Sequence, residues 1–158
     1  MHSHTKQITA QGKPLDEAQR AMIMVHGRGS NAPDILSLAR YLDVAGFALL
    51  APQATGYSWY PYSFMAPVER NEPGLSTGLA VLSDLVDDIL AAGLPPESIF
   101  FLGFSQGACL TSEYLARHAR RYGGAFLYSG GVIGEQIDRT QYRAAFEGTP
   151  PFLGCSDT

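Results

Sequence analysis

Cysteine and charged residues are both scarce in this sequence. Its two cysteines, Cys109 and Cys155, are too few for a disulfide framework, and because each lies in an apolar segment we expect two buried thiols and no metal site. Charged residues make up only 16% of the chain, and acidic residues outnumber basic ones by 15 to 11. No basic stripe is available for a nucleic acid, so we expect no nucleic-acid partner.

Long apolar runs are also missing. No stretch stays apolar for the roughly 18 residues that a membrane span needs. The first six residues, from Met1 to Lys6, are polar and lack the apolar core of a secretory signal. We therefore expect no stable membrane insertion and a cytoplasmic protein, with His2 and His4 solvated in a polar tail.

What the sequence does contain is enough apolar material for a core. Apolar residues make up 46% of the 158 residues. This length suits one compact domain, and the balance of apolar to charged residues is that of a globular protein. We predict a single domain over residues 1–158.

Short apolar runs alternate with amphipathic helical patterns along the chain, which is typical of parallel strands joined by crossover helices. The runs predicted as strands are 21–25, 47–51, 98–102, 125–128 and 151–155. Helical spacing predicts helices over 33–42 and 75–90, and a third that begins just after residue 105 and runs to about 120. The expected fold is a three-layer α/β sandwich with a mainly parallel sheet and helices on both faces.

A long aromatic segment interrupts this alternation between residues 53 and 74. Its aromatic residues are Tyr57, Trp59, Tyr60, Tyr62 and Phe64. A loop of this length is usually functional or disordered, and so many aromatic residues argue against disorder. Two roles stay open: a hydrophobic cover over the sheet, or a substrate-pocket wall that includes Trp59 and Tyr60.

The pattern Gly103-Phe104-Ser105-Gln106-Gly107 lies between an apolar run and a helical pattern. In this context G-x-S-x-G is typical of a serine nucleophile on a strained strand-to-helix turn, where side chains in place of the glycines would collide with neighbouring strands. We interpret Ser105 as the nucleophile. The alternative is an ordinary turn in which a serine caps the helix.

An attacking serine also needs hydrogen-bond donors for the oxyanion. One backbone N–H is expected from the residue after the nucleophile, which is Gln106, and the second from the loop after an earlier strand. His26-Gly27-Arg28-Gly29 occupies that loop, and we assign the N–H of Arg28 to it. A plain glycine-rich turn is the alternative.

The same loop also satisfies a dinucleotide-binding pattern. Residues 27–32 read G-x-G-x-x-A after a predicted strand and before a predicted helix. That fingerprint expects an acidic residue at the end of the next strand, where this chain has Ala51-Pro52-Gln53. The missing acid disfavours this reading.

Several motifs together resemble the phospholipase/carboxylesterase family of α/β hydrolases, which includes acyl-protein thioesterases. The motifs are Val25–Gly29, Ala51–Pro52, Trp59–Tyr60, Asn71–Ser76, Gly103–Ala108 and Gly154–Asp157. The resemblance implies an α/β-hydrolase fold, a Ser, Asp, His triad, hydrolysis of short- or medium-chain carboxylic esters or thioesters, and no cofactor. It carries Ser105 over as nucleophile, with Arg28 and Gln106 as the oxyanion pair.

The triad base should follow the nucleophile along the chain, and only His118 does. It lies thirteen residues along the helix that Ser105 opens, roughly 20 Å away at 1.5 Å per residue. We therefore expect His118 to be a surface or helix-end residue. His26 precedes the nucleophile and, by the resemblance, is a structural group, although it remains a candidate substitute base.

By the resemblance, the triad acid would come directly after Asp157 and the histidine later still. We therefore expect an α/β-hydrolase domain that is incomplete at its C-terminus. The expected partners are a small-molecule ester and either a second polypeptide segment that carries the Asp and the His, or a homodimer. The rival from another class is a binding protein that kept the fold and lost its catalytic activity.

Overall fold

All the strands belong to one six-stranded sheet in the computed structural model, which describes residues 3–142 and 145–155. The strands are β1 (Ile8–Gly12), β2 (Arg20–Val25), β3 (Phe47–Pro52), β4 (Ile99–Phe104), β5 (Gly124–Tyr128) and β6 (Pro151–Gly154). Their order across the sheet is β1-β3-β2-β4-β5-β6. Only β1 runs antiparallel to its neighbour, so the prediction of a mainly parallel sheet is confirmed.

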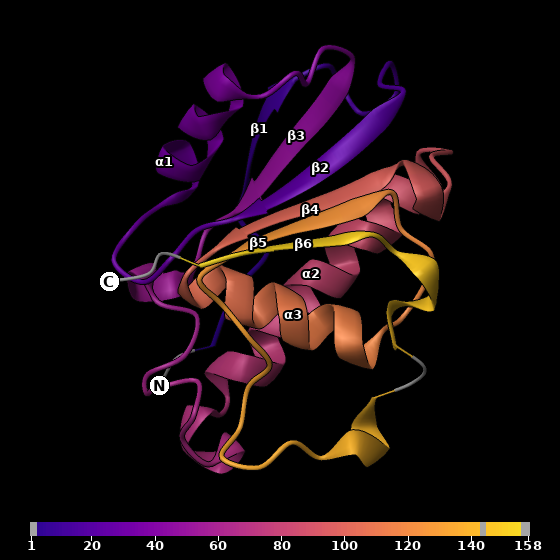
Figure 1. Ribbon diagram of the computed structural model, residues 1–158. Helices are drawn as coiled ribbons and strands as arrows, with labels where there is room; N and C mark the ends of the chain where they lie inside the picture. The colour runs from indigo at the N-terminus through magenta and orange to yellow at the C-terminus, as the bar shows by residue number, and fades with distance from the viewer. Residues whose placement is uncertain (1–2, 143–144, 156–158) are drawn as a thin grey trace.

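Helices cover both faces of the sheet (Figure 1). They are α1 (Ala32–Leu36), which continues as a 3-10 helix (Ser37–Tyr41), α2 (Gly74–Ala91) and α3 (Gln106–Arg117). Short 3-10 helices occupy Thr55–Tyr57, Val68–Asn71, Pro96–Ser98, Arg139–Gln141 and Ala145–Gly148. In the described part of the chain, no helix is both long enough and apolar enough to cross a membrane.

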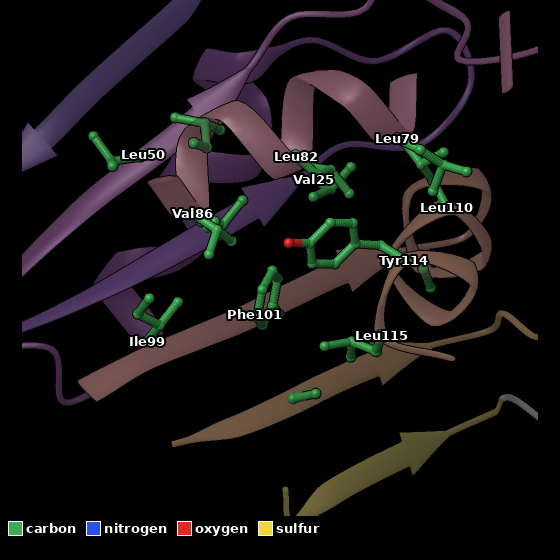
Figure 2. Close-up of a cluster of buried hydrophobic side chains, with 14 of the residues drawn as sticks. Val25, Leu50, Leu79, Leu82, Val86, Ile99, Phe101, Leu110, Tyr114 and Leu115 are labelled. Atoms are coloured by element: carbon green, nitrogen blue, oxygen red, sulfur yellow. The ribbon is translucent and has the colours of Figure 1, made fainter. Parts of the chain in front are cut away.

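The alternation of side chains along β2 divides the core into two layers. Ala21, Ile23 and Val25 belong to the layer under α2 and α3, whereas Met22 and Met24 belong to the layer under α1. Figure 2 shows the first of these layers, with aliphatic and aromatic side chains from β4, α2 and α3 packed together. The central strands are buried on both faces, which is why they read as continuous apolar runs in the sequence.

The sequence did not reveal β1, and the predicted third helix was too long. Four of the five residues of β1 are exposed, so this edge strand has no apolar alternation to mark it. α3 ends at Arg117 rather than near residue 120, and His118, in a non-helical conformation, caps it. The prediction that His118 lies at a helix end is confirmed.

His4 is not a solvated tail residue, which corrects the prediction. It is 8% exposed, and its backbone N–H donates to Thr77 Oγ1 at 3.1 Å. Its ring Nε2 donates to Trp59 O at 2.8 Å, and Nδ1 accepts from the Thr55 N–H at 3.1 Å. Because a neutral imidazole has one donor and one acceptor, both ring atoms find matched partners. His2 lies outside the described residues.

The two cysteines differ from each other. Cys109 is 3% exposed on α3, as predicted. Cys155 is exposed, which corrects the prediction: it follows β6 at the outer edge of the sheet, where no strand of the described residues covers it.

Candidate active site

Ser105 forms a sharp turn between the end of β4 and the start of α3. Its backbone has φ 51° and ψ −118°, and its side chain is exposed. A Cβ added to Gly103 would lie 2.7 Å from the Ala108 Cα, and one added to Gly107 would lie 2.2 Å from the carbonyl oxygen of Val25. Both distances are too short for any side chain, so the glycines permit the helix to begin directly against β2 and β4.

The loop after β2 lies beside this serine. A Cβ added to Gly27 would be 3.4 Å from the Ser105 Cβ, which places the backbone of this loop in contact with the turn. Within the described residues, the N–H groups of Arg28 and Gln106 donate no hydrogen bond to the protein. The structure therefore places the loop that contains Arg28 against the turn that contains Ser105 and Gln106.

The side chain of Gln106 is buried and holds the aromatic loop, residues 57–64. Its Oε1 accepts from the Trp59 N–H at 2.8 Å, and its Nε2 donates to Tyr60 O at 2.8 Å. The Ser58 hydroxyl donates to the same Tyr60 oxygen at 2.9 Å. These partners fix the orientation of the amide, because a backbone N–H can only donate and a carbonyl can only accept.

Arg28 holds the next part of the aromatic loop. Its exposed guanidinium donates to Pro61 O at 3.0 Å and to Tyr62 O at 2.8 Å. Farther along, the fully buried Asn71 accepts from the Tyr62 N–H at 2.9 Å and donates to Ser63 O at 2.9 Å. The loop is therefore ordered by side-chain hydrogen bonds rather than by helix or strand pairing.

Trp59 and Tyr60 are buried in the core, as expected for a cover over the sheet, and their predicted place on a substrate-pocket wall stays a prediction. They are 0% and 1% exposed. The indole Nε1 of Trp59 donates to His26 O at 2.9 Å, and its ring lies 5.1 Å from the His4 ring and 5.3 Å from the His26 ring. The Trp59 ring can be buried because its indole N–H has a hydrogen-bond partner inside the protein. Other residues of this region, Tyr57, Tyr62, Phe64 and Met65, are exposed.

His26 is fully buried, and hydrogen bonds fix its neutral form. Its Nδ1 donates to Gly27 O at 2.8 Å, and its Nε2 accepts from the Ala54 N–H at 3.1 Å. Burial lowers the pKa of His26 below its ordinary value. Because both ring nitrogens are engaged, His26 has no free acceptor for the Ser105 proton in this structure.

α1 begins with its own capping groups beside the glycine-rich loop. The Asn31 side chain accepts from the Asp34 N–H at 2.9 Å, and Gln53 Oε1 accepts from the Ala32 N–H at 2.9 Å. A dinucleotide phosphate would need these N–H groups. Their use inside the protein, and the amide at position 53, argue against the dinucleotide-binding alternative.

Glu113 is a buried carboxylate that the sequence analysis did not single out. It is 1% exposed and accepts from Arg117 Nε at 2.7 Å, from the Ile133 N–H at 2.8 Å and from the Tyr142 hydroxyl at 3.0 Å. Burial and the adjacent Glu113 raise the pKa of Tyr142 to about 12. The spacing of Glu113 and Arg117, four residues apart in a predicted helix, was the available signal. These contacts tie the segment after β5 to α3.

The region around β6 is open. Phe152 is 52% exposed and Leu153 is 68% exposed, and β6 has no neighbour on its outer side among the described residues. A groove of about 230 Å³ runs over the α1 side of β4 and β5, and Phe100, Phe126 and Tyr128 are among its lining residues. No group of three or more described His, Cys, Asp or Glu residues is arranged to hold a metal ion.

Comparison with known proteins identifies the family. A family model described as Phospholipase/Carboxylesterase matches residues 7–145. The crystal structure of a phospholipase/carboxylesterase from Dyadobacter fermentans is 50% identical, superposes with a TM-score of 0.94, and the match covers 97% of this chain and 73% of that one. The Bacillus cereus carboxylesterase, at 20% identity and a TM-score of 0.66 over 93% of this chain and 68% of its own, shows a likeness of fold.

Curated sequences agree with this assignment. Acyl-protein thioesterase 1 of Eremothecium gossypii is 28% identical over 139 residues, which cover 78% of this chain and 58% of that protein. The chain spans 47% to 58% of the length of the first curated relatives that it matches. The family model, the 50% identical structure and the sheet topology converge: the chain has the α/β-hydrolase fold and belongs to the phospholipase/carboxylesterase family.

Proposed function

We propose that the chain is the nucleophile-bearing part of a cytoplasmic serine esterase that hydrolyses small or medium-chain carboxylic esters or thioesters. The observation that carries this proposal is the backbone of Ser105, at φ 51° and ψ −118° with an exposed side chain. Holding a residue other than glycine in such a conformation costs about 1–3 kcal/mol, and such strain is concentrated at active sites. Membership of the family supports ester hydrolysis.

In the proposed reaction the Ser105 hydroxyl oxygen attacks the ester carbonyl carbon. A histidine base takes the hydroxyl proton, and the developing oxyanion is bound by the N–H groups of Arg28 and Gln106. The bond to the leaving alcohol or thiol breaks as that group receives the proton from the histidine. Water, activated by the same base, then releases the acid from the acyl-enzyme.

Covalent labelling tests this assignment. We expect a fluorophosphonate to label the protein at Ser105, and S105A to lose both labelling and esterase activity. S129A is the matched control, because Ser129 is also exposed and also has a positive φ of 56° at the end of the neighbouring strand. Labelling that survives in S105A refutes the nucleophile assignment, and a folded wild type that neither reacts nor turns over esters indicates a binding protein.

We also propose that the base and its carboxylate partner come from a polypeptide segment that covers β6. Phe152 and Leu153 are exposed apolar side chains on β6, which pairs with β5 but has no partner on its outer side among the described residues. Such a surface is typical of one that another segment buries. The groove over β4 and β5 adds an apolar recess on the same sheet. The 50% identical relative leaves about a quarter of its own chain unmatched, which is enough to supply such a segment.

A polypeptide of residues 1–158 tests this second proposal. Loss of the triad base costs several orders of magnitude in rate, so we expect turnover at least about 10⁴-fold below that of the whole enzyme. Sedimentation and intact mass establish which species is measured. Ordinary turnover by a monomer would refute the proposal, and turnover by a dimer alone would favour the homodimer instead.

A further inference from the structure

Two side chains bind the backbone of the aromatic loop at four consecutive residues. From Trp59 to Tyr62, each residue donates or accepts one hydrogen bond to Gln106 or Arg28, at distances of 2.8 to 3.0 Å. These are the two residues whose own N–H groups are proposed to bind the oxyanion. A third hydrogen bond joins the glycine-rich loop to the aromatic loop, since the Gly29 N–H donates to Tyr57 O at 2.7 Å.

The two side chains attach the loop to different elements. Gln106 is the first residue of α3 and is 6% exposed, so its amide is fixed by the helix and by its matched partners. Arg28 lies on the glycine-rich loop after β2, outside any helix or strand, and its guanidinium is exposed. The aromatic loop therefore joins the first residue of α3 to the glycine-rich loop after β2.

We infer that the side chains of Gln106 and Arg28 are positioning residues, which fix the distance between the two oxyanion-binding N–H groups by binding the same aromatic loop. This inference rests on the proposed function. An oxyanion hole requires donors 2.7 to 3.1 Å from the oxyanion, and a displacement of about 1 Å can cost roughly 100-fold in rate. The aromatic loop thus acts on the reaction without contacting the reacting atoms.

The attachment of the loop can be measured without activity through the fluorescence of Trp59, the single tryptophan of residues 1–158. Q106M keeps the length of the side chain and removes both hydrogen bonds. We expect the fluorescence emission of Trp59 to shift to longer wavelength and its acrylamide quenching constant to increase at least about threefold. The reason is that Gln106 no longer holds the backbone N–H of Trp59, so the ring loses its fixed position. S112A is the matched control: it removes a buried hydrogen bond of 2.7 Å within α3 and leaves the loop untouched.

Kinetics of the whole enzyme then test the positioning role. We expect Q106M and R28M each to lower kcat by about 10- to 100-fold with KM changed less than about threefold, because the oxyanion forms only in the transition state. Because R28M alters an exposed side chain, it should still fold, and it tests the positioning role if Q106M does not fold. An unchanged kcat, or a raised KM with kcat intact, would overturn the inference while S105A remained inactive. An active S105A would instead refute the proposed function itself.

Discussion

The end of β4 and the outer edge of β6 lie in the same sheet, but they differ in how many contacts they make with the rest of the described chain. Around Ser105, buried hydrogen-bonding side chains such as His26 and Gln106 connect the loops to each other. At β6, Phe152 and Leu153 are exposed and the outer edge is unpaired within the described residues. The comparison teaches that hydrogen bonds within the described residues hold the loops around Ser105, whereas no described segment covers the outer edge of β6, where we propose that a further segment carries the acid and the base.

The largest stability effect is expected at Gly107. G107A places a Cβ 2.2 Å from the Val25 oxygen, which forces the backbone of α3 away from β2. We expect a loss of at least about 3 kcal/mol in the free energy of unfolding, measured by urea denaturation. The control is G131A, where the nearest atom to an added Cβ is 4.0 Å away and a change within about 1 kcal/mol is expected. Equal effects of the two substitutions would show that the turn is not tightly fixed.

Replacing a phenylalanine in each of the two regions should lower the free energy of unfolding by different amounts, again measured by urea denaturation. Phe101 is fully buried on β4, and its ring meets the Tyr122 ring edge-on with 5.0 Å between the ring centroids. F101A should therefore lower the free energy of unfolding by about 3–5 kcal/mol. Phe152 is 52% exposed, so F152A in a polypeptide of residues 1–158 should cost less than about 1.5 kcal/mol. If a further segment covers β6, the cost of F152A should increase in the whole protein. An equal cost in both forms would argue against that cover.

The smallest effect is a pH dependence from His26. Burial lowers the pKa of His26 in the folded state, whereas in the unfolded chain it titrates near 6.5. The unfolded state therefore binds more protons as the pH falls from 7 to 5, and the free energy of unfolding decreases by at most about 1.4 kcal/mol per pH unit. H26Q keeps an acceptor for the Ala54 N–H and does not titrate, so its pH dependence should be shallower. Parallel profiles for H26Q and wild type would contradict this account.

The parts of the fold that the sequence predicts correctly are those with a local pattern. The central strands are buried on both faces and read as continuous apolar runs, and the glycines around Ser105 mark a turn where no side chain fits. The exposed strand β1 has no such pattern and was missed. Local sequence is informative where burial or backbone sterics act over a few residues.

The contacts of the aromatic loop could not be predicted in this way. His4 binds Trp59 O across 55 residues, and Gln106 binds the Trp59 N–H across 47. These pairs depend on where two loops meet in space, which no periodicity records. For the same reason, sequence reasoning could not separate a buried Trp59 from one on a pocket wall.

The most direct test of the central claim is to trap the acyl group on the enzyme. We would mix the whole protein with a slowly hydrolysed ester, quench with acid within the first turnover, and determine the modified residue by mass spectrometry of peptides. The account predicts one acyl group per chain on the peptide that contains Ser105, and none in S105A. Turnover with an unmodified Ser105, or an acyl group on another residue such as Cys109 or Cys155, would contradict it.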